Sequence, residues 1–305
     1  MVVVRWKSCY LISAMIRTWL VFLPLLLFSV LADPIKIACV GDSITEGTGL
    51  SSPTTQSYPA RLQRLLGTNY NVKNFGVSGR TLLKRGDFPY WKERAYTNSL
   101  TLNPDIVIIQ LGTNDSKPQN WRYGTNFVSD YNELIASYAS LTSSPAIYLC
   151  TPCPVYANGA YDIRPGIVAT NIAPLVREIA TSHSFPVIEL QTRMAGLAAL
   201  FPDTVHPNTR GMAVMAAVMF SALKPAPPIG SLPELAVKPI ATGRVAVTWP
   251  GLLGSFVAQS ASSLKSTNTA WAVFDTAIPA LNSDQQIELS LTSSGVPRYF
   301  RLWQP

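Results

Sequence analysis

Residues 35–47 read IKIACVGDSITEG, and this stretch contains the first strand of the fold and the turn that ends it. The run Ile35–Val40 is apolar except for one lysine, as expected of a strand buried inside a sheet. Gly41 and Asp42 end that run, and Ser43 follows at once. A residue just past the carboxyl end of a parallel strand lies in the crevice where such sheets hold ligands. The stretch therefore predicts a strand that delivers Ser43 to a functional edge.

Short apolar runs alternate with longer helical patterns as far as Leu223, which is typical of βαβ units around a parallel sheet. The predicted strands are Ile35–Val40, Val72–Phe75, Ile106–Leu111, Ala146–Leu149 and Val187–Leu190. The predicted helices are Tyr58–Leu66, Phe127–Leu141, Ile167–Thr181 and Thr209–Leu223. We therefore expect an α/β fold, a flavodoxin-like three-layer sandwich with a five-stranded parallel sheet, over residues 33–223.

The pattern changes at residues 224–234, KPAPPIGSLPE, which hold four prolines and one glycine. Prolines at this density stop helices and stiffen a spacer, so we expect a linker. Beyond it the apolar residues recur at about every second position, and the predicted strands are Val245–Trp249, Phe256–Gln259, Trp271–Phe274, Gln286–Leu291 and Tyr299–Trp303. Residues 235–305 are expected to form a small antiparallel β-sandwich-like domain.

Residues 1–32 have the features of a signal peptide. An apolar core, Trp19–Leu31, follows Arg17, and Val30 and Ala32 are small residues suited to a cleavage site before Asp33. The alternative is an uncleaved anchor, but the core is shorter than the roughly 20 residues that span a bilayer. We expect a secreted or periplasmic protein with no stable membrane insertion after cleavage. Met1 and Met15 both remain candidate starts.

Composition excludes two classes of protein. Hydrophobic residues make up 48% of the 305-residue chain and charged residues 13%, which excludes disorder of the low-hydrophobicity, high-charge kind. The net charge is +7, and three of the cationic residues lie in the leader. The remaining surplus is too small and too scattered for a nucleic-acid footprint, so no nucleic-acid partner is expected.

Three cysteines lie beyond the leader, and Cys150 and Cys153 form a CxxC pair. This pair fits small residues packed at a strand end, a local disulfide, or half of a zinc site. The chain has only two histidines and no second CxxC, so a four-ligand zinc site lacks partners. We expect no metal and no cofactor.

Ser43 has two interpretations. It is a candidate nucleophile, and it is also a candidate helix N-cap, because Glu46 follows it at capping-box spacing. The segment Asp203–His206 favours the nucleophile, since it places a carboxylate three residues before a histidine. Serine hydrolysis needs a base and a carboxylate that orients it. The rival base, His183, has no acid within four residues and is typical of a solvated helix end.

Two further loops follow predicted parallel strands and are candidates for an oxyanion hole. One runs from Gly76 to Gly79, and the other, GTND, includes Asn114. Backbone N–H groups and an asparagine amide are the donors that acyl transfer requires. The same dipeptides are also ordinary turn formers. We expect Asp42 and Asp115, which lie beside these tight loops, to hydrogen-bond backbone amides rather than to act as acids.

Four sequence blocks occur together in one order: GDSITEG at residues 41–47, NFGVSGRT at 74–81, LGTND at 111–115 and DTVHPN at 203–208. With these blocks the chain resembles the SGNH (GDSL) hydrolase superfamily of esterases and acylhydrolases. The resemblance implies that Ser43 is the nucleophile, His206 the general base and Asp203 the residue that orients it. It also implies that the oxyanion hole consists of the Ser43 and Gly79 N–H groups and the Asn114 amide.

The resulting hypothesis is an exported serine esterase that hydrolyses short-chain esters, preferably acetyl, on O-acetylated carbohydrate. Its expected partners are a small ester or an acetylated polysaccharide. One alternative is a lysophospholipase or thioesterase of the same superfamily, and another is a non-catalytic carbohydrate-binding protein. Four aromatic residues in the long segments after the second and third strands fit either sugar contacts or core packing: Tyr90, Trp91, Trp121 and Tyr123. The acyl acceptor and the oligomeric state stay open.

Overall fold

The computed structural model describes residues 33–223 in full and, further along the chain, the backbone of six strands between residues 236 and 303. The predicted signal peptide (residues 1–32) and linker (residues 224–234) lie outside the described residues, and both stay predictions.

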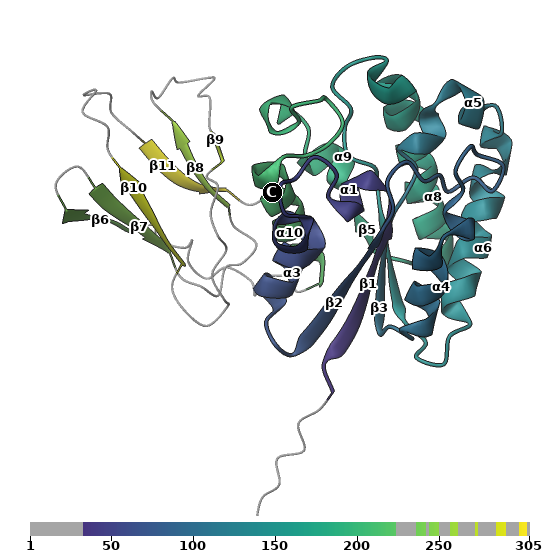
Figure 1. Ribbon diagram of the computed structural model, residues 1–305, viewed down its shortest axis with the longest axis horizontal. Coiled ribbons are helices and arrows are strands. Elements are labelled where there is room, and N and C mark those ends of the chain that lie inside the picture. The colour runs from purple at the N-terminus through teal and green to yellow at the C-terminus, as the bar shows by residue number, and fades with distance from the viewer. Residues whose placement is uncertain are drawn as a thin grey trace, which may run out of the picture. The chain divides into compact units, whose positions relative to one another are not determined.

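A five-stranded parallel sheet forms the centre of residues 33–223 (Figure 1). Its strands are β1 (Ile35–Gly41), β2 (Tyr70–Gly76), β3 (Ile106–Gln110), β4 (Ala146–Cys150) and β5 (Val187–Ile188). They lie in the order β2-β1-β3-β4-β5, the flavodoxin-like order. The prediction of an α/β fold with a five-stranded parallel sheet is confirmed.

The helices and shorter turns of this part are as follows. The α-helices are α1 (Ser43–Glu46), α2 (Pro53–Gln56), α3 (Tyr58–Leu66), α4 (Arg94–Thr101), α5 (Pro118–Trp121), α6 (Phe127–Ala139), α7 (Pro165–Ile167), α8 (Ala173–His183), α9 (Leu190–Arg193) and α10 (Thr209–Leu223). Short 3₁₀ turns are η1 (Tyr90–Lys92), η2 (Asn114–Ser116), η3 (Gly124–Asn126), η4 (Ala160–Asp162) and η6 (Ala198–Leu200), and η5 (Val168–Ile172) is a π-helical turn.

Helices cover both faces of the sheet, with α3 and α10 on one side and α4, α6 and α8 on the other (Figure 1). The strands alternate between these layers, because successive side chains of a strand point to opposite faces. Ile37 and Cys39 of β1 pack in the cluster that includes α3 and α10, while Ala38 and Val40 pack in the cluster that includes α6 and α8. Being buried on both faces explains why β1 is apolar almost throughout.

Three differences between the predicted and the observed elements in residues 33–223 have clear physical reasons. The strand predicted to reach Leu190 ends at Ile188, because α9 begins at Leu190. The helix predicted over residues 167–181 is a run of α7, the π turn η5 and α8. Helix α4 was not predicted, because its sequence RAYTNSLT is polar and buries only Ser99.

Helix α1 packs directly against the ends of β1 and β2, and two glycines make this possible. A Cβ on Gly76 would lie 2.1 Å from the Glu46 backbone nitrogen, and one on Gly41 would lie 2.0 Å from the Thr45 hydroxyl. Real Cβ atoms do not approach other atoms this closely, so both positions require glycine. The first residues of α1 are therefore fixed to the sheet.

Helix α10 is buried from residue 211 to residue 220, as expected of a short apolar helix in a core. Within the part of the chain that the structure describes, no helix has both the length and the apolar character needed to cross a membrane.

The cysteines beyond the leader are free and buried. Cys39 and Cys150 lie in the sheet core, and the Cys153 sulfur contacts the Met215 sulfur at 3.8 Å. Burial raises the pKa of all three thiols, which leaves them protonated and unreactive. The packing interpretation of the CxxC pair is confirmed.

The strands described after the linker are β6 (Ala236–Ala241), β7 (Arg244–Trp249), β8 (Val257–Ala261), β9 (Ala272–Val273), β10 (Gln285–Ser290) and β11 (Tyr299–Trp303). They form two three-stranded antiparallel sheets, in the orders β10-β7-β6 and β11-β8-β9. Strand β6 was not predicted because it contains Pro239, which is tolerated at a sheet edge and lies beside a register shift. How the two sheets pack is outside the described residues, so the sandwich-like domain stays a prediction.

Candidate active site

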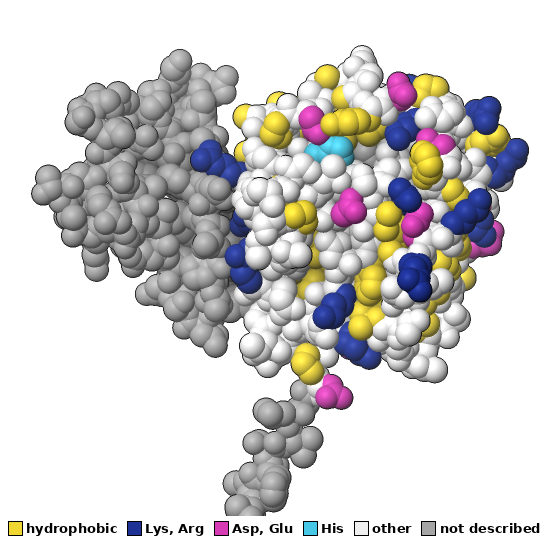
Figure 2. Space-filling model, viewed as in Figure 1, with side chains coloured by type: hydrophobic (Ala, Val, Ile, Leu, Met, Phe, Trp, Pro, Cys, Tyr) yellow, Lys and Arg dark blue, Asp and Glu magenta, His cyan; other side chains and the backbone are white. Residues whose placement is uncertain are grey.

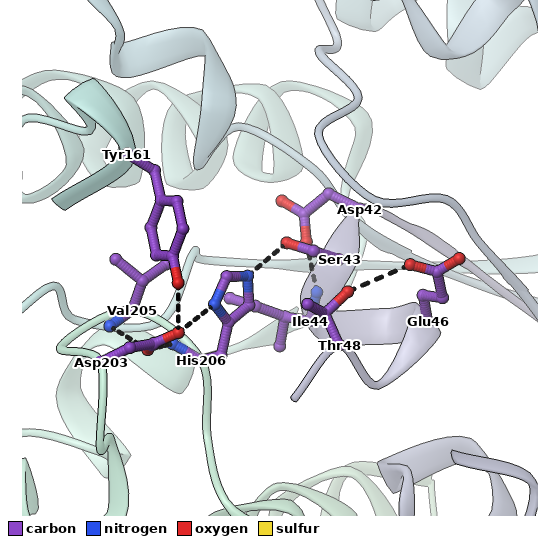
Figure 3. Close-up of polar contacts among 9 residues, drawn as sticks. All are labelled: Asp42, Ser43, Ile44, Glu46, Thr48, Tyr161, Asp203, Val205 and His206. Carbon is purple, nitrogen blue, oxygen red and sulfur yellow. Dashed lines mark hydrogen bonds and ion pairs between the residues drawn. The ribbon is translucent and has the colours of Figure 1, made fainter. Parts of the chain in front are cut away.

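Ser43 is the first residue of α1, directly after β1. The Asp42 side chain caps this helix by accepting a hydrogen bond from the Ile44 backbone N–H at 3.0 Å. The interpretation of Ser43 as the N-cap is therefore wrong, because Asp42 occupies that position. The Ser43 hydroxyl instead lies 2.8 Å from Nε2 of His206, a residue 163 positions away (Figure 3).

His206 and Asp203 lie in the turn that precedes α10. The Asp203 carboxylate accepts from Nδ1 of the His206 ring at 2.7 Å through Oδ2, which leaves Nε2 to face Ser43. Its Oδ1 accepts from the backbone N–H groups of Val205, at 3.0 Å, and His206, at 2.7 Å. The carboxylate therefore fixes both the turn and the orientation of the imidazole.

The Asp203 carboxylate keeps its negative charge although it is partly buried. Burial by itself would raise the pKa of this carboxyl, but the backbone and ring N–H groups of His206 and the Val205 N–H outweigh it and lower the pKa to about 2. Asp203 is thus ionised at neutral pH.

The turn is strained at Thr204, whose φ is +70°. A β-branched residue at positive φ is an outlier, so the surrounding contacts must hold it there. The Thr204 N–H donates to the Phe201 carbonyl and its own carbonyl accepts from the Tyr156 N–H, both at 2.9 Å. These bonds hold the turn that places Asp203 beside His206.

Gly79 and Asn114 lie on the loops after β2 and β3. In the register of the sheet, Gly41 at the end of β1 pairs with Gly76 of β2 and Gln110 of β3, so all three loops emerge at one edge. Gly79 adopts φ +79°, a conformation that favours glycine. The Asn114 amide donates to the Arg80 carbonyl at 3.2 Å, which joins the two loops next to Gly79. Since an amide nitrogen has two hydrogens, one of them remains for a ligand.

Ser43, Asn114 and His206 are each less than a tenth exposed. Low exposure reduces competition from water and strengthens each hydrogen bond at the site.

Asp42 and Asp115 are fully buried and bond to the backbone, as the sequence predicts. Asp115 accepts from the N–H groups of Leu82, at 3.0 Å, and Leu83, at 2.7 Å. Burial raises the pKa of both carboxyls to about 7 despite these bonds. Their contacts assign them to the support of the loops.

His183, the rival base, lies at the exposed end of α8. Its ring stacks on Phe185 with 5.2 Å between centroids, and its Nε2 lies 2.9 Å from the Asn132 side-chain oxygen. The interpretation of His183 as a solvated helix end is confirmed.

The four aromatic residues named from the sequence take packing roles in this structure. Tyr90 is fully buried, and the Trp91 indole N–H donates to the Leu82 carbonyl at 2.8 Å. Tyr123 has the guanidinium groups of Arg85 and Arg122 within 5 Å of its ring centroid. Trp121 packs on Phe127 in the core. Core packing is therefore the better interpretation, most clearly for Tyr90.

Tyr161 is the residue at this site that the sequence reasoning missed. Its hydroxyl donates to Asp203 Oδ2 at 3.0 Å, and its ring lies edge-on to His206 with 5.3 Å between centroids (Figure 3). Bonding to a carboxylate raises the pKa of the phenol, so the hydroxyl stays a donor. The only local signal is the turn dipeptide Asn158-Gly159, which places an aromatic residue just after a tight turn.

Acidic and basic side chains are interspersed over the visible face of the described domain, with no unbroken stripe of one sign there (Figure 2). No cluster of three or more His, Cys, Asp or Glu side chains suited to a metal ion occurs among the described residues.

Comparisons with known proteins concern the sequence and the fold of this chain. Residues 39–214 match the sequence model of the GDSL-like lipase/acylhydrolase family. An acetylxylan esterase from Xylanibacter ruminicola is 39% identical in an alignment of 210 residues, which covers 63% of this chain and 44% of that protein. The chain thus spans less than half the length of this curated relative.

Solved structures share the fold. A lipase/acylhydrolase from Enterococcus faecalis has a TM-score of 0.53 at 24% identity, covering 62% of this chain and 95% of the other. A carbohydrate acetylesterase from Sinorhizobium meliloti has a TM-score of 0.52 at 19% identity, covering 62% of this chain and 98% of the other. At these identities the likeness concerns the fold alone.

Proposed function

Because the chain belongs to the GDSL-like lipase/acylhydrolase family, we propose that it is an exported serine esterase that removes acetyl groups from O-acetylated carbohydrate. The observation that carries the proposal is the 2.8 Å contact between the Ser43 hydroxyl and His206 Nε2, in line with the bond from His206 to Asp203.

The first half of the reaction forms an acyl-enzyme. His206 Nε2 takes the proton of the Ser43 hydroxyl while Oγ attacks the ester carbonyl, and Asp203 stabilises the imidazolium that results. Three donors are proposed to bind the oxyanion: the Ser43 N–H, the Gly79 N–H and the Asn114 amide. The Ser43 N–H is suited to this role because the first N–H groups of a helix have no partner inside it.

The second half returns the enzyme to its starting state. His206 gives its proton to the oxygen of the departing alcohol as the carbon–oxygen bond breaks, and the acyl group remains on Ser43. Water then loses a proton to His206, attacks the acyl-enzyme carbonyl and releases the acid, and Oγ recovers its proton. Every step uses groups of this chain and water.

The proposed substrate class rests on one relative. The acetylxylan esterase is a curated protein with which this chain shares 39% identity, and the alignment covers 63% of this chain, about the extent of the described α/β domain. Acetyl is the acyl group and a polysaccharide the acyl acceptor in that protein's name. Both are proposed for this chain.

Replacement of the nucleophile tests the mechanism. Ser43→Ala is expected to abolish hydrolysis of p-nitrophenyl acetate without a change in the thermal midpoint, because the removed hydroxyl reacts but does not hold the fold. Ser140→Ala is the matched control, since this exposed hydroxyl donates to the Ser137 carbonyl at 3.0 Å, at the C-terminal end of α6. Full activity of Ser43→Ala would refute the mechanism.

A panel of acyl chains tests the substrate class. We expect acetyl esters to have the highest kcat/KM and acetylated xylan to release acetate. A maximum at eight carbons or more would refute the acetyl preference and favour a lysophospholipase or thioesterase. No turnover of any ester by the wild-type protein would favour a binding protein.

Export is tested by the N-terminus of the mature protein. The leader predicts cleavage before Asp33, so N-terminal sequencing of the protein recovered outside the cytoplasm should begin at Asp33. A mature chain that still carries residues 19–31 would contradict cleavage.

A further inference from the structure

Tyr161 presents a large exposed ring at the edge of the site. Its relative exposure is 58%, although its hydroxyl is bound to Asp203 and its ring borders His206. Figure 3 shows the ring standing over the Asp203 carboxylate, with the imidazole beside it. A single exposed apolar residue on a surface is ordinary, but this one is fixed against two residues of the proposed triad.

The segment that carries Tyr161 is attached on both sides. The Tyr156 N–H donates to the Thr204 carbonyl at 2.9 Å, and the Arg164 guanidinium donates to the Ser116 carbonyl at 2.7 Å. Between these bonds, Ala160 and Ile163 pack in one apolar cluster with Val205, the neighbour of His206. The ring is therefore held in place before any ligand arrives, and little conformational entropy is lost when one binds.

The backbone at this point is strained. Tyr161 has φ +54° and ψ 27°, and Asp162 follows with φ +62°. Bulky residues rarely adopt positive φ, and such conformations persist where the surroundings over-determine them, often at functional sites. The strained backbone is a second indication, besides the contacts of the segment, that the surroundings fix the position of the ring.

The chemistry of the reaction places the acyl acceptor beside this ring. His206 Nε2 must reach the oxygen of the departing alcohol to protonate it, so the alcohol group lies within a hydrogen bond of the imidazole. The Tyr161 ring borders that same imidazole at 5.3 Å between centroids. An alcohol bound at Nε2 is thus separated only by the imidazole ring from an aromatic surface that is open to solvent.

We propose that Tyr161 determines the acyl acceptor, by stacking its exposed face against the sugar ring whose acetyl group is being removed. This inference rests on the esterase function proposed above. Tyr161 combines a flat apolar face with a fixed polar end, the amphipathic arrangement that suits a ligand with both apolar faces and hydroxyl groups.

Two variants separate the ring from its hydroxyl. Tyr161→Phe keeps the ring and loses the bond to Asp203, while Tyr161→Leu loses both. Each is assayed with an acetylated xylo-oligosaccharide and with ethyl acetate, whose alcohol has no ring to stack. We expect both variants to lose a similar fraction of kcat/KM on ethyl acetate, because both lack the hydroxyl.

The ring should matter for the sugar substrate alone. Relative to Tyr161→Phe, Tyr161→Leu is expected to lower kcat/KM on the oligosaccharide a further 3- to 10-fold or so, mainly through KM. Equal losses of the two variants on both substrates would overturn the inference, as would an extra loss of Tyr161→Leu on ethyl acetate of the same size. Thermal midpoints within a few degrees of wild type establish that both variants fold.

The Ser43→Ala variant distinguishes the two proposals. Inactive Ser43→Ala together with a selective loss in Tyr161→Leu supports both. Inactive Ser43→Ala with no selective loss overturns the stacking role and leaves the esterase function standing. An active Ser43→Ala refutes the esterase mechanism itself.

Discussion

Asp115 and Asp203 lie at the same edge of the sheet and accept the same kind of backbone hydrogen bond, but they have different roles. Each carboxylate accepts two backbone N–H groups, from Leu82 and Leu83 in one case and from Val205 and His206 in the other. Asp115 is fully buried, whereas the Asp203 side chain is 34% exposed. Burial raises the pKa of Asp115 to about 7, and at Asp203 hydrogen bonds outweigh burial and lower it to about 2.

The difference shows what converts a supporting carboxylate into one that acts on a base. Asp203 has a second oxygen that faces an imidazole and a phenol, at 2.7 and 3.0 Å. In Asp115, both carboxylate oxygens accept hydrogen bonds from the backbone of the loop after β2. Removal of the two carboxylates should therefore damage different properties of the protein.

The largest expected effect is on turnover. Asp203→Asn should lower kcat on a short acetate ester on the order of 10³–10⁴-fold, because an amide no longer stabilises the imidazolium and can favour the wrong tautomer of His206. Steady-state kinetics measure the loss. A kcat within tenfold of wild type would remove Asp203 from the mechanism.

The next effect is on stability. Asp115→Asn should lower the free energy of unfolding by about 2–3 kcal/mol, because an amide oxygen can satisfy only one of the two buried N–H donors that the carboxylate binds. Urea denaturation measures the change. Asp105→Asn is the control, since that exposed carboxylate accepts a single bond from the Lys36 N–H and its loss should cost about 1 kcal/mol or less. Equal costs at the two positions would contradict the comparison.

A smaller effect on stability should come from backbone strain, which is present in the turn of Asp203 and absent from the loop of Asp115. Thr204 has φ +70°, whereas Thr113 beside the Asp115 loop has φ −60°. Thr204→Gly is expected to stabilise the fold by about 0.5–1 kcal/mol, since relief of the left-handed conformation exceeds the entropy lost by glycine. The thermal midpoint should rise by a few degrees. Thr204→Ala, which keeps a Cβ, should give no such rise.

The last effect is a pH dependence that has opposite signs at the two carboxylates. The folded pKa of Asp115, about 7, lies above the ordinary aspartate value of 3.8, so its contribution to stability is present below about pH 4 and is lost as the pH rises through 7. The folded pKa of Asp203, about 2, lies below 3.8, so its contribution is present above about pH 4 and is lost as the pH falls through 2. Solvent screening limits the Asp203 contribution to less than about 1 kcal/mol.

Urea titrations at pH 3, 5 and 8 measure these two contributions. The stability difference between wild type and Asp115→Asn should shrink from pH 5 to pH 8. The difference between wild type and Asp203→Asn should shrink from pH 5 to pH 3. A stability difference that shrinks toward the same end of the pH range for both variants would contradict the assigned pKa values.

Much of the central fold is predictable from the sequence because its strands are buried on both faces. Three apolar runs became β1, β3 and β4 close to their predicted ends, whereas β2 contains two exposed polar residues and extends beyond the predicted Val72–Phe75 at both ends. Strand β5 is shorter than predicted because Leu190 already begins α9, and an apolar run alone cannot show where a strand becomes a helix. Helix α4 was missed because it is short and five of its eight residues, RAYTNSLT, are polar, although Ala95, Tyr96 and Leu100 pack against the core.

The candidate site also has residues that the sequence could predict and one that it could not. Ser43, Asn114 and His206 follow or precede regular elements in recognisable blocks, so their convergence at one edge could be predicted. Tyr161 could not be, because its bond to Asp203 joins residues 42 positions apart and depends on two consecutive positive φ angles. No periodicity encodes such a turn, and a tyrosine after Asn-Gly has many other uses.

The loop after β4 connects the turn at residues 203–206 with the loop after β3, through the bonds from Tyr156 to Thr204 and from Arg164 to Ser116. Loss of the Tyr156–Thr204 bond would release the turn that holds His206, and loss of the Arg164–Ser116 bond would release the loop that holds Asn114. Because one loop makes both bonds, we expect loss of either to weaken the other. Amide hydrogen exchange at the three loops should accordingly follow one cooperative opening, which precedes the melting of the sheet beneath. Heat would then switch off the reacting centre before the fold is lost.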